Sequence, residues 1–421
     1  MNYSMIRYIL SSVICFVGIF LLLPAATAGI YQEKEGFLYL IIGLACMLIG
    51  FWGRRRKPKS SVFYSKEGFA AVALSWIILS LIGALPMYLT GEFPSYIDAL
   101  FETISGFTTT GSSILSDVET LSRGTAFWRC FTHWIGGMGV LVFIMAVMPL
   151  SDSSSMHLMR AESPGPSVGK LVPKVKTTAM ILYGIYVVFT VIEIIALLIA
   201  GMPLFDSMTL TFGTVGTGGF GLLNSSIASY STAVQIIITV FMIICSINFT
   251  VYYMFLIKRP KEALMCEEMR YYLLIVFGSA LLIAFNIRAS FASFGKAFQQ
   301  AIFQVASVIS TTGFATADFN LWPEFSRMIL VLLMFVGACA GSTGGGFKVS
   351  RLIIMVKSVR NEIMSVTHPR SVQKVHMDGR RIPDNVVKTV LCYLAGYVVI
   401  LIVSVLLISL DTVSYTHLTL P

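Results

Sequence analysis

Three short apolar stretches of the chain end at turns rich in threonine and glycine, and each lies between two long hydrophobic segments. With Gly111, Gly218 and Gly313 set in one column, the stretches read DALFETISGFTTTG, FDSMTLTFGTVGTG and QAIFQVASVISTTG. A unit of helix, half-helix, turn and helix therefore recurs about every hundred residues, which indicates an internally repeated fold.

Composition places this repeat in a membrane. Hydrophobic residues make up 56% of the chain, charged residues make up 12%, and the mean hydropathy is +0.82. These values are typical of an integral membrane protein, and we predict an all-α fold. Irregular backbone is not tolerated against lipid, so each turn must line protein or a water-filled cavity.

The residue types in the turns favour a cation. Glycine can turn its carbonyl inward with a positive φ, and rows of carbonyl oxygens can replace the hydration shell of a potassium ion. A half-helix that ends at the turn adds the negative end of its dipole. One such turn would be read as a connecting loop, but three copies, each between two spans, predict parts of one ion filter.

The hydrophobic segments have lengths near the roughly 20 residues that a bilayer requires. We expect spans at 8–30, 37–53, 68–90, 127–150, 178–200, 231–257, 271–287, 326–358 and 389–410. The first span ends in Ala26-Thr27-Ala28, which is similar to a signal-peptidase site, so cleavage of residues 1–28 is the alternative to an uncleaved first span.

The net charge of +9 follows from topology rather than from nucleic-acid binding. With a cytoplasmic amino terminus, most basic residues fall on the inner side, including the run Arg54–Lys59, and the predicted filter turns fall on the outer side. The lysines and arginines that remain outside are Lys34, Arg123, Arg129, Arg288, Lys296 and Arg327.

Acidic residues near the turns could raise the cation concentration at the outer mouth, although solvated loop charges are an equal alternative. These acids are Glu92, Asp98, Glu102, Asp117, Glu119, Asp206, Asp318 and Glu324. Glu193 is different because it lies inside a predicted span, where an ionisable group is costly and indicates a functional role with a buried partner.

A second distinctive stretch, GACAGSTGGGFK from Gly337 to Lys348, lies in the middle of the predicted span 326–358. Each glycine costs a helix about 1 kcal/mol relative to alanine, so we expect a flexible intramembrane loop. The corresponding positions of the other two units, Gly136–Gly139 and Cys245–Asn248, are milder. We predict a movable gate below the filter, and close helix packing is the alternative. Lys348 and Arg351 could hold the loop by pairing with acids or carbonyls, or could snorkel to the interface.

No enzyme site is apparent. The cysteines and histidines have no metal-ligand spacing, and no catalytic triad order or phosphate-binding glycine loop is present in the sequence. We therefore expect no catalytic residues and no organic cofactor. A membrane receptor or scaffold would explain the spans but not three filter turns, and a membrane enzyme would require a cluster to which only Glu193 could contribute.

The motifs FETISGFTTTG, FWRCFTHWIGGMGVLVF, TFGTVGTGGF, STTGF and GACAGSTGGGFKVSR resemble the Trk/Ktr/HKT superfamily, most of all its bacterial TrkH-like members, over residues 1 to about 411. The resemblance implies potassium uptake across the bacterial inner membrane, four pseudo-symmetric helix, pore-helix, helix repeats, and an amino-terminal helix pair. It also implies a homodimer and a TrkA-like cytosolic nucleotide-binding regulatory protein. A Ktr-like sodium-dependent transporter is the alternative. Basic loops at 151–177, 258–270 and 358–388 are available to the partner or to anionic lipid.

By position, the resemblance gives a helix pair at 1–60, pore repeats at 61–150, 151–260 and 261–365, and a linker with an incomplete fourth repeat at 366–421. A fourth filter is missing, so we expect a truncated sequence. Some plant relatives carry serine at the first filter glycine and favour sodium, so Gly111 favours potassium by analogy. The filter residues that would hold potassium are Thr108, Thr109, Thr110, Gly111, Val215, Gly216, Thr217, Gly218, Ser310, Thr311, Thr312 and Gly313. The gate residues are Ala338, Cys339, Ala340, Gly341, Ser342, Thr343, Gly344, Gly345 and Gly346.

Overall fold

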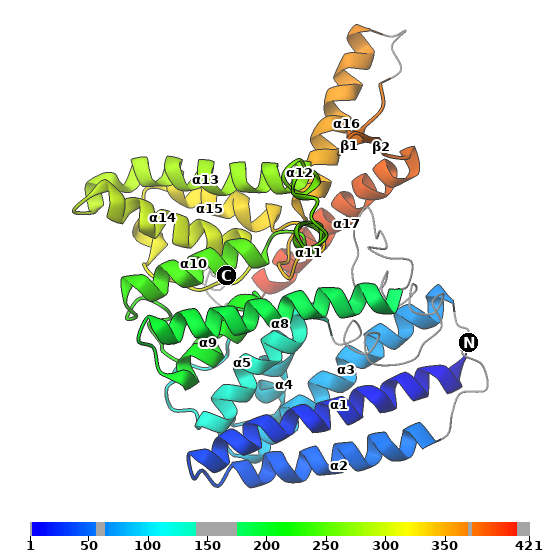
Figure 1. The fold of residues 1–421 in the computed structure, drawn as a ribbon, viewed down its shortest axis with the longest axis vertical. Helices are drawn as coiled ribbons and strands as arrows, with labels where there is room; N and C mark the ends of the chain where they lie inside the picture. The colour runs from blue at the N-terminus through cyan, green and yellow to red at the C-terminus, as the bar shows by residue number, and fades with distance from the viewer. Residues whose placement is uncertain (1, 56–63, 140–174, 369–372, 411–421) are drawn as a thin grey trace.

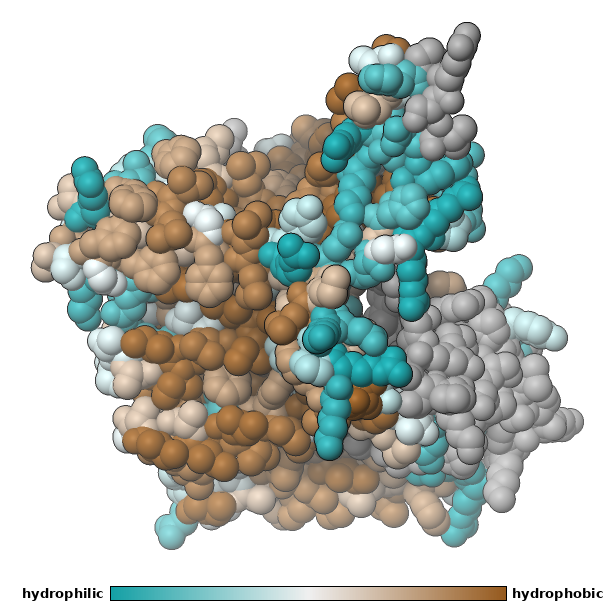
Figure 2. Space-filling model, turned by 45° about the horizontal axis from the view of Figure 1, so that its top comes forward, coloured by the Kyte–Doolittle hydropathy of each residue, from teal (hydrophilic) through white to brown (hydrophobic). Residues whose placement is uncertain are grey.

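The computed structural model describes residues 2–55, 64–139, 175–368 and 373–410, and it has an all-α membrane fold (Figure 1). Within these residues, six helices are long and apolar enough to cross a membrane, or seven if a bent pair counts as one span. Hydrophobic side chains cover most of the helical surface in view, while hydrophilic ones gather around the end where α16 and a small hairpin project (Figure 2). The long helices lie side by side (Figure 1), and their apolar surface fits the membrane class that the composition predicts.

Three units of similar construction form the body of the protein. Each consists of a long helix, a short helix that ends inside the fold, and a third helix that returns past it. The units are α3 (Ser65–Leu89), α4 (Tyr96–Phe107) and α5 (Arg123–Met138); α8 (Val175–Ile199), α9 (Leu204–Val215) and α10 (Thr232–Cys245); and α13 (Glu267–Ile287), α14 (Phe294–Ile309) and α15 (Glu324–Val336). Serine caps start two of the short helices, because Ser95 and Ser293 accept the backbone N–H of Asp98 and Lys296.

The remaining elements connect or flank these units. They are α1 (Tyr3–Ile30), α2 (Gly36–Arg55), α11 (Phe249–Leu256), α12 (Pro260–Leu264), η1 (Arg288–Ser290), η2 (Phe319–Leu321), α16 (Val349–Thr367), β1 (His376–Met377), β2 (Arg380–Arg381) and α17 (Asp384–Ser409). The two strands pair antiparallel across a two-residue turn, Asp378-Gly379, in which both residues have positive φ, as a tight hairpin requires.

Helices α1 and α2 pack closely through glycines. A Cβ added at Gly18 would lie 2.6 Å from the carbonyl oxygen of Gly43, and one added at Gly50 would lie 2.6 Å from Cys15. Small residues allow this approach of two membrane helices. The pair is tied to the first unit by Glu33, whose carboxylate accepts the N–H groups of Arg123 and Gly124 at the start of α5.

The structure corrects three of the predicted spans. The segment 326–358 is not one span, because α15 ends at Val336 and α16 begins only at Val349. The segment 231–257 bends by 88° between α10 and α11. In the segment 127–150, α5 ends at Met138, because the φ of +75° at Gly139 leaves the helical region, and the residues that follow lie outside the described part. The three breaks fall at the stretches noted in the sequence, which are Gly337–Lys348, Cys245–Asn248 and Gly136–Gly139.

The glycine contact between α1 and α2 gives a first testable prediction. Leucine at Gly50 would overpack the interface with Cys15 and should lower the free energy of unfolding by about 1–3 kcal/mol. Leucine at Gly184 in α8 is the matched control, since an added Cβ there has no neighbour within 4 Å. Thermal unfolding in detergent should show a lower midpoint for Gly50→Leu alone; equal midpoints for both variants would contradict the tight packing.

Candidate functional site

The three short helices end in the same hydrogen-bonded turn. In the first, the N–H of Thr109 donates to the carbonyl of Gly106 (3.1 Å) and the N–H of Thr110 donates to that of Ser105 (2.9 Å). This pair of bonds is the Schellman motif, which satisfies carbonyl groups that a helix end leaves unpaired. The same two bonds recur at the other helix ends, from Thr217 and Gly218 and from Thr311 and Thr312.

The left-handed position of this motif is occupied by threonine in all three copies. The φ angles are +55° at Thr109, +53° at Thr217 and +60° at Thr311. Glycine is the usual residue there, and a β-branched residue in this region is strained, at a cost on the order of 1–3 kcal/mol. Such strain persists only where the surroundings fix the conformation, and it gathers at functional sites.

The backbone corrects the alignment of the second copy by one residue. Hydrogen bonds and φ angles make Gly219 (φ +85°), rather than Gly218, the equivalent of Gly111 and Gly313. Val215, a predicted filter residue, is the last residue of α9 and is buried against Tyr186. Two consecutive glycines in GTGG left the register ambiguous in sequence. The three turns are therefore Thr108–Gly111, Gly216–Gly219 and Ser310–Gly313, called here turns 1, 2 and 3.

The turns contact one another in a repeated way. A Cβ added at Gly111 would lie 2.0 Å from the carbonyl oxygen of Gly218, and one added at Gly219 would lie 1.8 Å from that of Thr312. The fourth residue of one turn thus faces the third carbonyl of the next, so successive turns follow each other around a common centre. At Gly313, among the described residues, an added Cβ has no neighbour within 4 Å.

Helix α5 lies between turns 1 and 2. An added Cβ at Gly136 would lie 2.2 Å from the carbonyl oxygen of Phe107, and one at Gly137 would lie 2.7 Å from Gly216. The buried ring of His133 packs against Gly218 and accepts the backbone N–H of Phe220 at Nδ1 (3.3 Å), so the proton of a neutral ring is on Nε2. The glycines and histidine of the FWRCFTHWIGGMG stretch are therefore contact residues of the turns.

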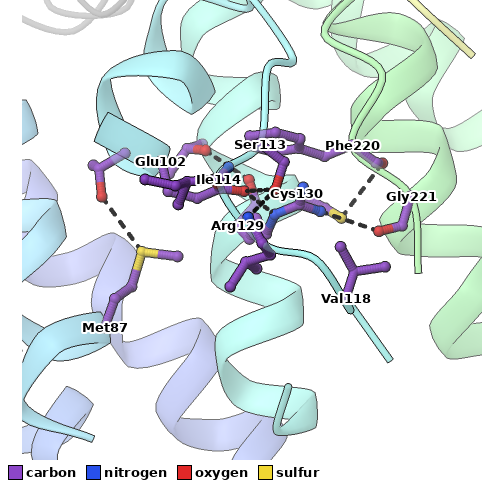
Figure 3. A network of polar contacts seen from close by, with 12 residues as sticks. Met87, Glu102, Ser113, Ile114, Val118, Arg129, Cys130, Phe220 and Gly221 are labelled. Atoms are coloured by element: carbon purple, nitrogen blue, oxygen red, sulfur yellow. Dashed lines mark hydrogen bonds and ion pairs between the residues drawn. The ribbon is translucent and has the colours of Figure 1, made fainter. Parts of the chain in front are cut away.

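A buried ion pair lies beside the segments that follow turns 1 and 2 (Figure 3). Glu102 of α4 and Arg129 of α5 are 2.5 Å apart, and their side chains are 0% and 4% exposed. The Glu102 carboxylate also accepts the Ser113 hydroxyl (2.9 Å) and the Ile114 N–H (3.0 Å), which fix the segment after turn 1. Arg129 donates to the carbonyl of Gly221 after turn 2 (3.1 Å). One pair of charges thus connects the segments that follow turns 1 and 2.

The other acids near the turns mainly bind backbone and loop groups. Glu92 accepts the N–H of Ser122 (2.6 Å), and Asp117 accepts the side chain of Asn224 (2.8 Å), which holds the pKa of the Asp117 carboxyl below its usual range. Asp206 accepts the hydroxyl of Tyr230 (3.2 Å). Glu193 is fully buried in α8 beside Thr214 of α9, and its carboxylate oxygens make no hydrogen bond to the described residues. Glu193 therefore lies behind turn 2 rather than in it.

The stretch from Gly337 to Lys348 breaks the helix, as predicted, and folds back on itself. The N–H of Lys348 donates to the carbonyl of Val336 (2.9 Å), and the N–H of Ala338 donates to that of Gly345 (3.3 Å). Gly337 and Gly346 have φ of +70° and +80°, and a Cβ on Gly346 would lie 2.5 Å from Gly337. Only glycine can adopt these φ angles where the two backbone segments approach so closely, so Gly337 and Gly346 are both required here.

This loop lies against turn 3 and the break between α10 and α11. The N–H of Gly345 donates to the hydroxyl of Thr311 (2.7 Å), and an added Cβ at Gly344 would lie 2.8 Å from the carbonyl oxygen of Ser310. The N–H of Cys339 donates to the carbonyl of Ser246 (3.0 Å). In this conformation, hydrogen bonds hold the loop on several sides.

The two cations after the loop bind carbonyl groups, one of the predicted alternatives. The Lys348 ammonium donates to the carbonyl of Gly344 within the loop. The Arg351 guanidinium donates to the carbonyl of Phe347 (3.0 Å) and lies 4.0 Å from the centre of the Tyr393 ring of α17. Both side chains thus fix the loop and the start of α16.

The Glu102–Arg129 pair gives a second prediction. Glu102→Gln leaves the buried charge of Arg129 uncompensated, which should cost about 3–5 kcal/mol of stability. Glu324→Gln is the matched control, because Glu324 pairs with Arg327 but is 80% exposed, and exposed pairs contribute about 0–1 kcal/mol. Chemical denaturation in detergent should separate the two variants; similar losses would show that burial does not set the strength of the Glu102 pair.

Comparison with known proteins shows which proteins share this sequence and fold. The model of the family described as TrkH, cation transport protein, matches residues 39–420. The chain is 34% identical over 408 residues to the Trk system potassium uptake protein TrkH of Salmonella typhimurium, covering 94% of this chain and 83% of that protein. It is 31% identical over 402 residues to TrkG of Escherichia coli, with coverages of 94% and 82%. The crystal structure of the potassium transporter TrkH from Vibrio parahaemolyticus aligns with a TM-score of 0.86 at 29% identity, covering 96% of this chain and 85% of that one.

Proposed function

The chain belongs to the TrkH family of cation transport proteins, and on this premise we propose that it takes up potassium ions across the bacterial cytoplasmic membrane. The relatives named above are two potassium uptake proteins and a potassium transporter, and the described helices are apolar enough for a multi-pass protein. The distribution of basic residues supports a cytoplasmic amino terminus.

The ion pathway runs past turns 1, 2 and 3. The observation that carries this proposal is the repeated contact between the third carbonyl of one turn and the glycine of the turn before it. Three helix C-termini point their negative ends at the same centre, which favours a cation there. Carbonyl oxygens around such a centre can replace the water of a potassium ion, and the Schellman bonds fix their positions.

The loop 338–346 is the gate of this pathway. It lies directly against turn 3, and its glycines allow arrangements that other residues would exclude. The loop makes hydrogen bonds to Thr311, Ser246 and Glu268, so opening of the proposed gate requires that these bonds be exchanged. A gate built in this way can be shifted by a regulator that binds one arrangement better than the other.

The proposed assembly is a homodimer with a TrkA-like cytosolic nucleotide-binding regulatory protein. The Trk system named for the relatives supports a regulated complex. The basic surface of α16 and the hairpin supports the cytoplasmic side as the contact region, since Lys357, Arg360 and Lys374 line one hollow there. Potassium is the transported ion in this proposal, and no organic cofactor is assigned to the chain.

Serine at Gly111 tests the filter. The added side chain would meet the carbonyl oxygen of Gly218 at a position with φ of +77°, so it should displace turn 2 and reduce the preference for potassium over sodium. Gly221→Ser is the matched control, because an added Cβ there has only contacts at 4.0 Å. The measurement is the ratio of potassium to sodium uptake in potassium-uptake-deficient cells. An unchanged ratio for Gly111→Ser would remove Gly111 from the filter.

Shortening the gate loop tests gating separately from selectivity. Deletion within Ser342–Gly345 should raise basal potassium flux and leave the potassium preference intact, because the backbone bonds that set the carbonyl positions of turn 3 lie within its own helix end, and the loop adds only contacts from outside, such as that of Gly345 with the Thr311 hydroxyl. Rubidium and sodium fluxes into proteoliposomes measure both properties. If flux stays at the parent level in a folded, membrane-inserted variant, the loop is a packing element and the gate lies elsewhere.

A further inference from the structure

One carboxylate holds both ends of the gate loop. Glu268, in the first turn of α13, is 3% exposed, and its Oε1 accepts the backbone N–H of Ala340 (2.7 Å) and that of Ser350 (3.0 Å). Ala340 lies near the beginning of the loop and Ser350 lies in the first turn of α16. The same oxygen therefore bridges the two sides of the chain reversal.

The two hydrogen bonds to the Glu268 carboxylate are stronger than ordinary backbone hydrogen bonds. A carboxylate that accepts backbone N–H groups makes charge-assisted bonds, roughly twice as strong as neutral ones. Lys348, the nearest cation of the loop, directs its ammonium to the carbonyl of Gly344, so the carboxylate remains available to the backbone. Without Glu268, two buried N–H groups would lose their acceptor, and leaving such groups unpaired is costly.

The neighbouring residue connects the same helical turn to the hairpin. The N–H of Glu267 donates to Oδ1 of Asp378 (2.7 Å), in the turn between β1 and β2. The Glu267 carboxylate pairs with Lys357 of α16 (2.5 Å), and Lys357 also donates to the carbonyl of His376 (2.7 Å). The start of α13 is thus bound on one side to the hairpin and on the other to the gate loop.

We propose that the first turn of α13 relays the position of the β1–β2 hairpin to the gate loop, with Glu268 as the positioning residue that holds the loop closed. The inference rests on the proposed gating function of the loop. A partner that displaces the hairpin moves Asp378 and Glu267, and the adjacent Glu268 then withdraws from Ala340 and Ser350. The movement of the hairpin is thus passed to the loop through one helical turn, the first turn of α13.

The test measures basal rubidium flux and the reactivity of Cys339 in the reconstituted protein. Cys339 is fully buried and precedes Ala340, so release of the loop should expose it to a thiol reagent added on the cytoplasmic side, with Cys339→Ser as the blank. Glu268→Ala should raise both flux and reactivity roughly tenfold or more, as expected for the loss of charge-assisted bonds to two N–H groups. Glu268→Gln keeps a neutral acceptor and should give intermediate values.

A double-mutant cycle tests the relay. Asp378→Gly removes the hairpin acceptor and suits the φ of +51° at that position. It should raise flux and Cys339 reactivity in the parent and add nothing in Glu268→Ala, because both changes act through one contact. Glu324→Ala, which breaks an exposed pair with Arg327 within α15 and no contact of the hairpin, is the matched control and should behave as the parent.

The outcomes separate the two proposals. No potassium flux in the parent and in the loop-shortened variant would overturn the proposed function itself. High flux in the loop-shortened variant, with parental flux and Cys339 reactivity in both Glu268 variants, would overturn the inference about Glu268 alone. Additive effects of Asp378→Gly and Glu268→Ala would overturn the relay.

Discussion

A helix that ends within a membrane leaves backbone carbonyl groups without partners, and neither water nor lipid is there to satisfy them. The three short helices meet this constraint with the same Schellman bonds, made from the threonine and the residue after it. Two carbonyls of each helix are paired in this way, and farther along the chain the carbonyls of Gly218 and Thr312 face the glycine of the preceding turn. The positions of the carbonyl groups in the three turns thus follow from the hydrogen bonds that satisfy the helix ends.

The threonines at the left-handed position carry a cost that the surroundings must offset. At turn 3, the hydroxyl of Thr311 is used twice, since it donates to the carbonyl of Ser310 (2.6 Å) and accepts the N–H of Gly345. At turn 2, the hydroxyl of Thr217 donates to the carbonyl of Gly216 (2.8 Å). Glycine would relieve the strain, but it would lack these hydroxyl bonds. The contacts of α5 then hold turns 1 and 2 in place through glycines that bring its backbone against theirs.

Much of this arrangement could be predicted from sequence, for identifiable reasons. Hydropathy and the repeated column of turns predicted the all-α membrane fold and the three interrupted helices, because apolar segment length and glycine placement are local properties. The register of turn 2 could not be fixed, since Gly218 and Gly219 are equally small and only hydrogen bonds distinguish them. The roles of Glu102 and Glu268 were also missed. Their partners, Arg129 and the N–H of Ala340, lie 27 and 72 residues away, and no pattern in the sequence joins them.

The contact between Thr311 and Gly345 gives turn 3 different surroundings from those of turns 1 and 2. Turns 1 and 2 are backed by α5, a helix whose backbone is fixed by its own hydrogen bonds, whereas turn 3 shares a hydroxyl with the loop beneath it. Rearrangement of that loop would withdraw a hydrogen-bond donor from turn 3 and leave the contacts of α5 with turns 1 and 2 in place. In the proposed pathway, a change in the conformation of the loop therefore reaches turn 3 first, so the pathway responds to its gate on one side rather than evenly around its circumference.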